Sequence, residues 1–193
     1  TIEPIIRGLG RSRQPIAREE PDLARPLGAA DSAPTAAAVL IPLFEVTEDP
    51  SAAATVRVLL TRRTEDVRTH KGQISFPGGA RDAADADLEA TALRETHEEI
   101  GLPPAQVRII GRLPDFHTIT GFVVAPFVGV IAHPHVLRPN PREIAEVIEP
   151  ALDEFVQPGV LRAQTVEYLG IRRAVLFYHL GGPDGAETIV WGA

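Results

Sequence analysis

Residues 94–101 read RETHEEIG. The run before this glycine, residues 87–100, contains neither glycine nor proline. The run consists mostly of good helix formers and therefore predicts an α-helix. Gly101 stands at the position where a left-handed residue commonly ends a helix, and Pro103 and Pro104 follow it. We therefore expect one well-defined helix that stops just before Gly101.

Three glutamates of this helix are predicted to share one face. A helix advances by about 100° per residue, so Glu95, Glu98 and Glu99 fall within roughly 100° of one another. Leu93 and Ile100 are expected on the opposite side, facing a core. Like charges at these spacings repel by roughly 0.2–0.5 kcal/mol per pair, and we expect no cationic side chain at the same spacing to offset them.

A hard divalent cation would offset this repulsion. Mg²⁺ takes oxygen ligands, keeps several waters and completes its shell with phosphate oxygens of a substrate. The alternative interpretation is an acidic helix face that is simply solvated. The helix alone does not distinguish a metal site from such a face.

The segment before the helix favours the metal site. Gly78 and Gly79 predict a tight turn at which the backbone can approach a ligand or metal closely. Together, turn and helix closely resemble the Nudix box of the Nudix hydrolase family, which has the form GX5EX7REUXEEXGU with U a bulky apolar residue. The matching residues are Gly79, Asp85, Arg94, Glu95, Glu98, Glu99, Gly101 and Leu102.

Two positions depart from the family's pattern. Asp85 replaces the usual glutamate and is followed by one extra residue before Arg94, and Thr96 stands at the first bulky apolar position. Asp85 is still an acid. We therefore expect it to form the salt bridge that Arg94 makes in this family.

A second motif lies upstream and resembles the pattern LLTXR(S/A)X3RX3GX3FPGG of Nudix enzymes that act on coenzyme A. The matching residues are Leu59, Leu60, Thr61, Arg63, Arg68, Gly72, Phe76, Pro77, Gly78 and Gly79, with Thr64 at the serine or alanine position. Within that group the longer spacing around Asp85 also occurs. Further matches are residues 121–122, 126–129, 139–141, 143 and 191–193.

The resemblance implies an α/β fold, the Nudix α/β/α sandwich with a mixed β-sheet. It also implies a coenzyme A diphosphatase that needs Mg²⁺ or Mn²⁺. Such an enzyme hydrolyses coenzyme A to 3′-phosphoadenosine 5′-phosphate and 4′-phosphopantetheine, and thioesters of coenzyme A are further candidate substrates.

Two alternatives stay open. One is a Nudix hydrolase of another nucleoside diphosphate derivative, such as ADP-ribose or an oxidised nucleotide, and the upstream motif weighs against it. The other is a catalytically silent domain that binds a nucleotide and regulates a partner. Silent forms are expected to lose glutamates from the helix, whereas here all three are present.

The family's site residues carry over position by position. Glu95 and Glu99 are expected to be the principal metal ligands, and Glu98 either a third ligand or the base that activates water. Arg94 is assigned, with Glu95 and Glu98, to the catalytic machinery. Other candidates for the base, on a later segment, are Glu143 and Glu146.

Basic residues gather just before the glycine turn. Coenzyme A carries a diphosphate and a 3′-phosphate, so an acidic protein needs local positive charge to bind it, and arginine matches phosphate oxygens in pairs. The candidates for substrate binding are Arg63, Arg68, His70, Lys71, Gly78 and Gly79. The alternative for each basic residue is surface charge at the end of a strand.

Histidines contribute less to the prediction. His97 lies on the helix and is expected to flank the site rather than bind metal. His133 and His135 enclose Pro134, and a proline-containing loop after a strand is favoured over a metal-binding pair.

The remaining pattern predicts an α/β domain of several strands. Residues 36–46 and 55–63 are apolar and β-branched around a turn, which predicts paired strands. Further strands are predicted at residues 107–113, 122–131, 142–148, 166–168, 174–180 and 188–191. A short helix is predicted at residues 151–156.

We expect the Nudix domain to span residues 35–193, after an irregular arm, residues 1–34, that contains one short helix near residues 5–9. Relatives that act on coenzyme A usually continue past the segment 191–193 into a helix that covers the sheet. This chain stops at Ala193. We therefore expect either further residues or a second subunit, in a homodimer, over that apolar surface.

Composition excludes several classes of protein. The 193 residues include no cysteine, which excludes disulfides, thiolate metal sites, iron–sulfur clusters and a cysteine nucleophile. A net charge of −7 argues against a nucleic-acid partner. The longest apolar stretches, residues 36–44 and 122–132, are too short to span a membrane, and no leader segment is evident. We therefore expect a cytoplasmic protein without a membrane partner.

Overall fold

The computed structural model describes residues 1–11, 34–47, 49, 51–65, 72–118, 121–168, 171–181 and 187–191. Within these residues the largest sheet has six strands, in the order β2–β1–β8–β6, with β5 paired to β1 and β7 paired to β8. The strands are β1 (Thr35–Val46), β2 (Thr55–Val58), β5 (Gly78–Ala80), β6 (Val107–Arg112), β7 (Phe116–His117) and β8 (Phe122–Ile131). β1 and β8 run parallel and the other pairs run antiparallel, so the sheet is mixed.

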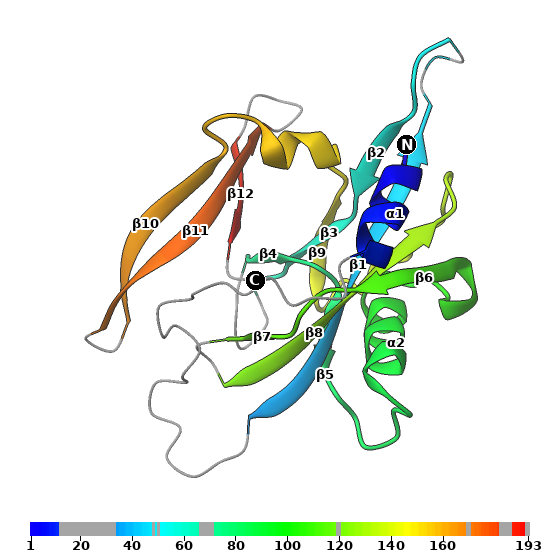
Figure 1. Ribbon diagram of the computed structural model, residues 1–193. Helices are drawn as coiled ribbons and strands as arrows, with labels where there is room; N and C mark the ends of the chain where they lie inside the picture. Colours follow the sequence, from blue (N-terminus) through cyan, green and yellow to red (C-terminus); the bar gives the residue numbers. More distant parts are fainter. Residues whose placement is uncertain are drawn as a thin grey trace.

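Helices cover both faces of this sheet. Ala38 and Leu40 of β1 lie in one apolar cluster with Ala92 of α2 (Leu88–Ile100). Leu43 lies in another cluster, against which residues of α1 (Glu3–Arg11) pack. Because successive side chains of a strand point to opposite faces, α1 and α2 lie on opposite faces of the sheet (Figure 1). The predicted α/β/α layering around a mixed sheet is confirmed.

The short helix predicted near residues 5–9 is confirmed as α1, and it is part of the core. Ile2 is buried, and Ile5, Ile6 and Leu9 pack against the cluster that contains Leu43. The first residues of the chain thus complete one face of the sheet. The spacing of Ile2, Ile5, Ile6 and Leu9 is that of one apolar helix face, a signal that the expectation of an irregular arm overlooked.

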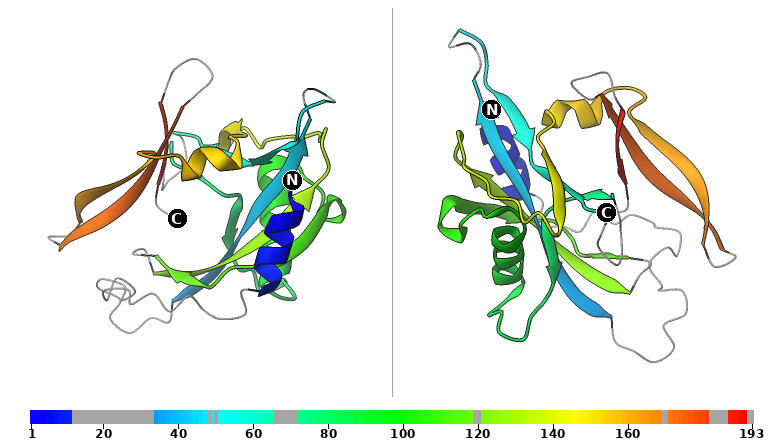
Figure 2. Two further views of the ribbon diagram at one scale, coloured as in Figure 1. Left: turned by 45° about the horizontal axis from the view of Figure 1, so that its top comes forward. Right: turned by 180° about the vertical axis from the view of Figure 1, so that it is seen from behind.

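Two smaller sheets complete the fold. One has the order β4–β3–β9 and the other the order β10–β11–β12. Their strands are β3 (Leu60–Arg63), β4 (Ile74–Ser75), β9 (Ile144–Ile148), β10 (Leu161–Tyr168), β11 (Ile171–Gly181) and β12 (Glu187–Trp191). The 3₁₀-helices are η1 (Pro104–Gln106) and η2 (Leu152–Val156). Figure 2 shows the β10–β12 sheet projecting from the side of the molecule.

Most predicted elements are confirmed. The predicted strands at residues 36–46, 107–113, 122–131, 142–148, 166–168, 174–180 and 188–191 overlap β1, β6, β8, β9, β10, β11 and β12. The short helix predicted at residues 151–156 is the 3₁₀-helix η2. No helix among the described residues is both long and apolar enough to cross a membrane.

Two local predictions were wrong. Residues 55–63 do not form one strand, because Leu59 N–H still donates to Pro42 O of β1 at 3.0 Å, whereas Leu60 pairs with Ile148 of β9. β2 therefore pairs with β1, and β3 pairs with β9. The glycine turn also contains a strand, since Gly78–Ala80 (β5) pairs antiparallel with β1.

Candidate active site

The carboxylate helix α2 begins and ends at recognisable caps. Asp87 accepts a hydrogen bond from Ala90 N at 2.8 Å, which satisfies one of the free amides at the helix start. Gly101 has a φ of 70°, and its N–H donates to His97 O at 2.9 Å. The predicted helix and its left-handed C-cap are confirmed.

Glu99 is the buried carboxylate of the site. Its side chain is only 4% exposed, Gly78 N–H donates to Oε2 at 3.2 Å, and Arg63 Nη1 donates to Oε1 at 3.2 Å. Burial raises the pKa of Glu99 to about 7, and repulsion from Glu95 and Glu143 adds to this, whereas Arg63 and Gly78 act against it. Glu99 is therefore a carboxyl group whose charged form is disfavoured mainly because it is shielded from water.

Glu95 lies beside Glu99 and against the glycine segment. A Cβ atom placed on Gly79 would lie 2.6 Å from Glu95 Cδ, so a side chain at this position would force the carboxylate to move. At Gly78 the φ is 154°, and a Cβ atom would lie 2.3 Å from Ala38 O in the neighbouring strand. Burial also raises the pKa of Glu95, although Arg94 opposes the shift. The glycines thus allow close approach of the backbone to the carboxylates themselves.

Arg94 connects the loop before α2 to two of the glutamates. Its Nε donates to Asp85 Oδ1 at 2.8 Å and its Nη2 to Asp85 Oδ2 at 2.9 Å. Its Nη1 donates to Glu95 at 2.9 Å and to Glu98 at 3.0 Å. These hydrogen bonds from Arg94 lower the pKa of Asp85 well below its usual range. The expected Arg94–Asp85 salt bridge is confirmed.

The prediction that three glutamates share one acidic face with no cation to offset their repulsion needs correction in two respects. Arg94 pairs with Glu98 at the i, i+4 spacing, so a cationic partner does exist there. The three glutamates also differ in environment, because the side chain of Glu98 is 55% exposed while that of Glu99 is buried. Ile100 is buried as expected, but Glu99 is buried beside it and Leu93 is only half-buried.

Thr96 shows how a polar residue replaces the usual bulky apolar one. It is fully buried, and its hydroxyl donates to Ala92 O at 2.7 Å, one turn earlier in the helix. The hydroxyl is therefore satisfied within the helix, and burial carries no unpaired polar group.

The donor set at this site fits a hard divalent cation. Glu95 is half-buried and Glu99 is buried, and burial is the main cause that raises the pKa of each. Carboxylate oxygens of this kind suit Mg²⁺ and Mn²⁺. In the described part of the chain, no three acidic or histidine side chains already converge as a metal-binding group. Glu98, held by Arg94, would have to turn to become a third ligand.

The two other candidates for the base lie in different surroundings. Glu143 is close enough to raise the pKa values of both Glu95 and Glu99, and it accepts a hydrogen bond from Asn140 Nδ2 at 3.2 Å. Glu146 instead pairs with Arg62 at 2.8 Å on the surface. The structure therefore brings Glu143, and not Glu146, to the carboxylate cluster.

Only part of the predicted substrate site lies in the described residues. Arg63 is described, and it contacts Glu99 rather than standing apart as a phosphate ligand. Arg68, His70 and Lys71 lie outside the described residues, so their role stays a prediction. His97 is exposed, as expected for a residue that flanks the site.

The histidine pair after β8 has a packing role. The rings of His133 and His135 lie 5.4 Å and 4.7 Å from the ring of Phe44. His135 Nε2 also lies 2.8 Å from Glu149 Oε1. The prediction of a loop after a strand is confirmed, with an aromatic cluster that explains the histidines.

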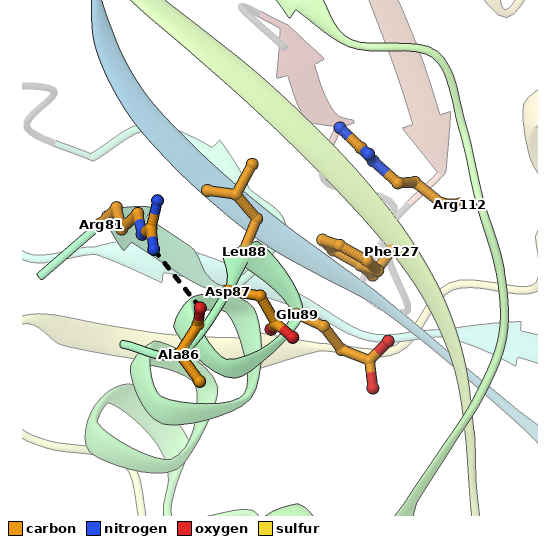
Figure 3. Close-up of a pocket in the computed structure, with 7 residues that line it drawn as sticks. All are labelled: Arg81, Ala86, Asp87, Leu88, Glu89, Arg112 and Phe127. Carbon is orange, nitrogen blue, oxygen red and sulfur yellow. Dashed lines mark hydrogen bonds between the residues drawn. The ribbon is translucent and has the colours of Figure 1, made fainter. Parts of the chain in front are cut away.

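An open pocket of about 430 Å³ lies near the start of α2 (Figure 3), and neither Glu95 nor Glu99 lines it. Its lining residues are Arg81, Ala86, Asp87, Leu88, Glu89, Arg112 and Phe127. Its arginines are already engaged, since Arg81 donates to Ala86 O at 3.4 Å and Arg112 pairs with Asp115 and lies over the Phe127 ring. We therefore place the chemistry at Glu95 and Glu99 and not in this pocket.

The family follows from comparison with known proteins. The sequence model of the NUDIX domain matches residues 34–169, which is more than half of the chain, so the protein belongs to the Nudix family. A protein of Pectobacterium atrosepticum described as "Uncharacterized Nudix hydrolase NudL" is 45% identical over 118 residues, which cover 61% of this chain and 58% of that protein. A protein of the same description from Photorhabdus laumondii is 35% identical over 135 residues, 70% of each chain.

Solved structures agree with this fold. A Nudix hydrolase from M. smegmatis, RenU, superposes with a TM-score of 0.52 at 26% identity, covering 67% of this chain and 80% of that chain. An Ap4A hydrolase of C. elegans in a binary complex has a TM-score of 0.50 at 19% identity, covering 62% and 82%. The protein therefore has the Nudix fold. The chain spans about three fifths of the length of the Pectobacterium relative that it matches.

Proposed function

We propose that this protein is a Nudix hydrolase that cleaves the diphosphate of coenzyme A with the help of Mg²⁺ or Mn²⁺. The observation that carries the chemistry is the pair of carboxylates, the half-buried Glu95 and the buried Glu99, against Gly79 and Gly78. Burial raises the pKa of both carboxyl groups, so a cation would favour their charged forms, and a diphosphate substrate needs the same cation to neutralise its own charge.

The residues of the site have separable tasks in this proposal. Glu95 and Glu99 hold the cation, which would neutralise the diphosphate and lower the pKa of a bound water. Arg94 orients Glu95 and anchors the preceding loop through Asp85. The proton of the attacking water goes to a nearby carboxylate, for which Glu98 and Glu143 are the candidates.

Coenzyme A is proposed from the motif upstream of the site. That motif supplies Arg63, Arg68 and Lys71 just before the glycine segment, and its group of Nudix enzymes acts on coenzyme A. Arginine forks match the diphosphate and the 3′-phosphate of this substrate. The products are 3′-phosphoadenosine 5′-phosphate and 4′-phosphopantetheine. A cytoplasmic location, a homodimer and the absence of nucleic-acid partners stay predictions from the sequence.

A substrate panel tests the proposal. The protein is incubated with Mg²⁺ and, separately, coenzyme A, ADP-ribose or 8-oxo-dGTP, and the products are separated by chromatography. We expect cleavage of coenzyme A to the two named products and little cleavage of the others. Preferential cleavage of ADP-ribose or 8-oxo-dGTP would assign the protein to another Nudix activity, and binding without cleavage would indicate a regulator.

The Glu99→Gln variant tests the site itself. Loss of a charged metal ligand is expected to lower kcat by several orders of magnitude, because the cation supplies much of the charge stabilisation. The Glu89→Gln variant, an exposed change on the same helix, is the matched control and should keep its activity. Wild-type turnover by Glu99→Gln would remove this helix from the active site.

A further inference from the structure

The strand β3 delivers Arg63 to the edge of the carboxylate cluster. The N–H of Arg63 donates to Gln73 O at 2.9 Å, and the register between β3 and β9 shifts between Arg62 and Arg63. An irregularity of this kind re-aims a side chain next to a site. Arg62 pairs with Glu146 on the surface, whereas Arg63, on the opposite face of the strand, reaches the buried Glu99.

The contact between Arg63 and Glu99 is long for a charged hydrogen bond. Nη1 and Oε1 are 3.2 Å apart, whereas guanidinium–carboxylate bonds are commonly about 2.7–2.9 Å. The Nε atom of Arg63 is also buried and, among the described residues, has no hydrogen-bond partner. A buried donor without an acceptor is unfavourable, so this guanidinium still has a donor to offer to another anion.

One described cation, Arg63, and two carboxylates act on Glu99. Glu95 and Glu143 both act on it electrostatically, and Arg63 is the described cation that opposes them. A divalent cation held by Glu95 and Glu99 would repel the guanidinium and take over its carboxylate oxygen. Because the Arg63 side chain is 26% exposed, it can turn toward a ligand at the mouth of the site.

We propose that Arg63 is an internal counter-ion of Glu99 that a divalent cation displaces, and that its guanidinium then binds phosphate oxygens of the substrate. This inference rests on the proposed metal site at Glu95 and Glu99. Arg63 can bind either Glu99 or a phosphate ligand, but not both at once. A cation that releases Arg63 from Glu99 therefore raises the affinity for the phosphate ligand, and the phosphate ligand raises the affinity for the cation by the same factor. In the absence of a phosphate ligand, Arg63 competes with the cation.

The direction in which Mn²⁺ affinity changes when Arg63 is replaced distinguishes a displaced counter-ion from a residue that only stabilises the site. Mn²⁺ binding is measured by electron paramagnetic resonance at about pH 8.5, well above the usual pKa of glutamate. Each protein is measured with and without 3′-phosphoadenosine 5′-phosphate, a nucleotide that has no anhydride bond to cleave. Without the nucleotide, Arg63→Gln is expected to bind Mn²⁺ roughly threefold or more tightly than the wild type. With the nucleotide, the variant should lose most of the mutual enhancement that the wild type shows.

Matched variants make the result decisive. Arg62→Gln, at the adjacent position, should leave Mn²⁺ affinity at the wild-type value. Arg63→Met keeps the apolar stem of the side chain and replaces Arg63→Gln in the test if Arg63→Gln does not fold. Unchanged or weaker Mn²⁺ binding in both Arg63 variants would overturn the inference. If Glu99→Gln has lost Mn²⁺ in that case, the proposed metal site still stands. If Glu99→Gln binds Mn²⁺ like the wild type, the metal site itself fails.

Discussion

Arg94 and Asp85 form a two-point ion pair, in which Nε meets Oδ1 at 2.8 Å and Nη2 meets Oδ2 at 2.9 Å. The same guanidinium donates to Glu95 and Glu98, so one side chain connects the loop before α2 to two carboxylates of the proposed site. The aspartate is shorter than the glutamate that the family's motif prescribes. One extra residue in the loop accompanies it, and the bridge still forms.

Asp85→Asn is expected to lower the melting temperature and to weaken the hold of Arg94 on Glu95. Arg94 keeps the pKa of Asp85 well below its usual range, so the stabilisation is present above the unfolded pKa of about 4 and is lost as the pH falls below it. The difference in melting temperature between wild type and variant should therefore shrink in acid. A difference that stays constant from neutral to acidic pH would contradict the ion pair as its origin.

Gly78→Ala is expected to lower stability, whereas Gly79→Ala is expected to disturb the Glu95 carboxylate. At Gly78 the added Cβ meets Ala38 O of the backbone, which cannot give way, and the positive φ adds strain, so stability should fall by about 1–3 kcal/mol or more. At Gly79 the Cβ meets the mobile end of Glu95, so the fold should survive while the carboxylate moves. Denaturant unfolding and Mn²⁺ binding distinguish the two. Equal losses of stability would contradict the separation.

Glu99→Gln is expected to change how metal-free protein responds to pH. Burial raises the pKa of Glu99 to about 7, so its contribution to stability is fully present below the unfolded pKa of about 4.3 and is lost as the pH rises through about 7. Relative to the variant, the wild type should lose on the order of 1–3 kcal/mol over this range. Urea unfolding in EDTA at several pH values measures it, and parallel pH curves for the two proteins would contradict it.

Arg68→Ala tests the substrate motif. If Arg68 contacts a phosphate of coenzyme A, its loss removes a charge-assisted hydrogen bond worth roughly 1.5–3 kcal/mol and should raise KM about ten- to a hundredfold. Steady-state kinetics with coenzyme A and dephospho-coenzyme A measure the effect. Equal losses on both substrates would exclude a dedicated 3′-phosphate contact, and an unchanged KM for both would remove Arg68 from the site.

Local sequence was enough to predict the elements that depend on near neighbours. The helix over residues 88–100, its cap at Gly101 and the strand β8 follow from composition and punctuation within about one element. The Arg94–Asp85 bridge was predicted from the resemblance to the Nudix box, and the structure contains it. These features depend little on the rest of the molecule.

Segments distant in the chain decide the character of the site. Glu98 and Glu99 are adjacent and chemically identical, yet one is exposed and the other is buried, because β1 and β5 press against one side of α2. Arg63 meets Glu99 across 36 residues, a contact that no local periodicity reveals. Burial and charge pairing are properties of the packed molecule, since they depend on which surfaces exclude water. The acidic helix could therefore be predicted from the sequence. Only the folded chain determines that Glu99 is buried, Glu95 half-buried and Glu98 exposed.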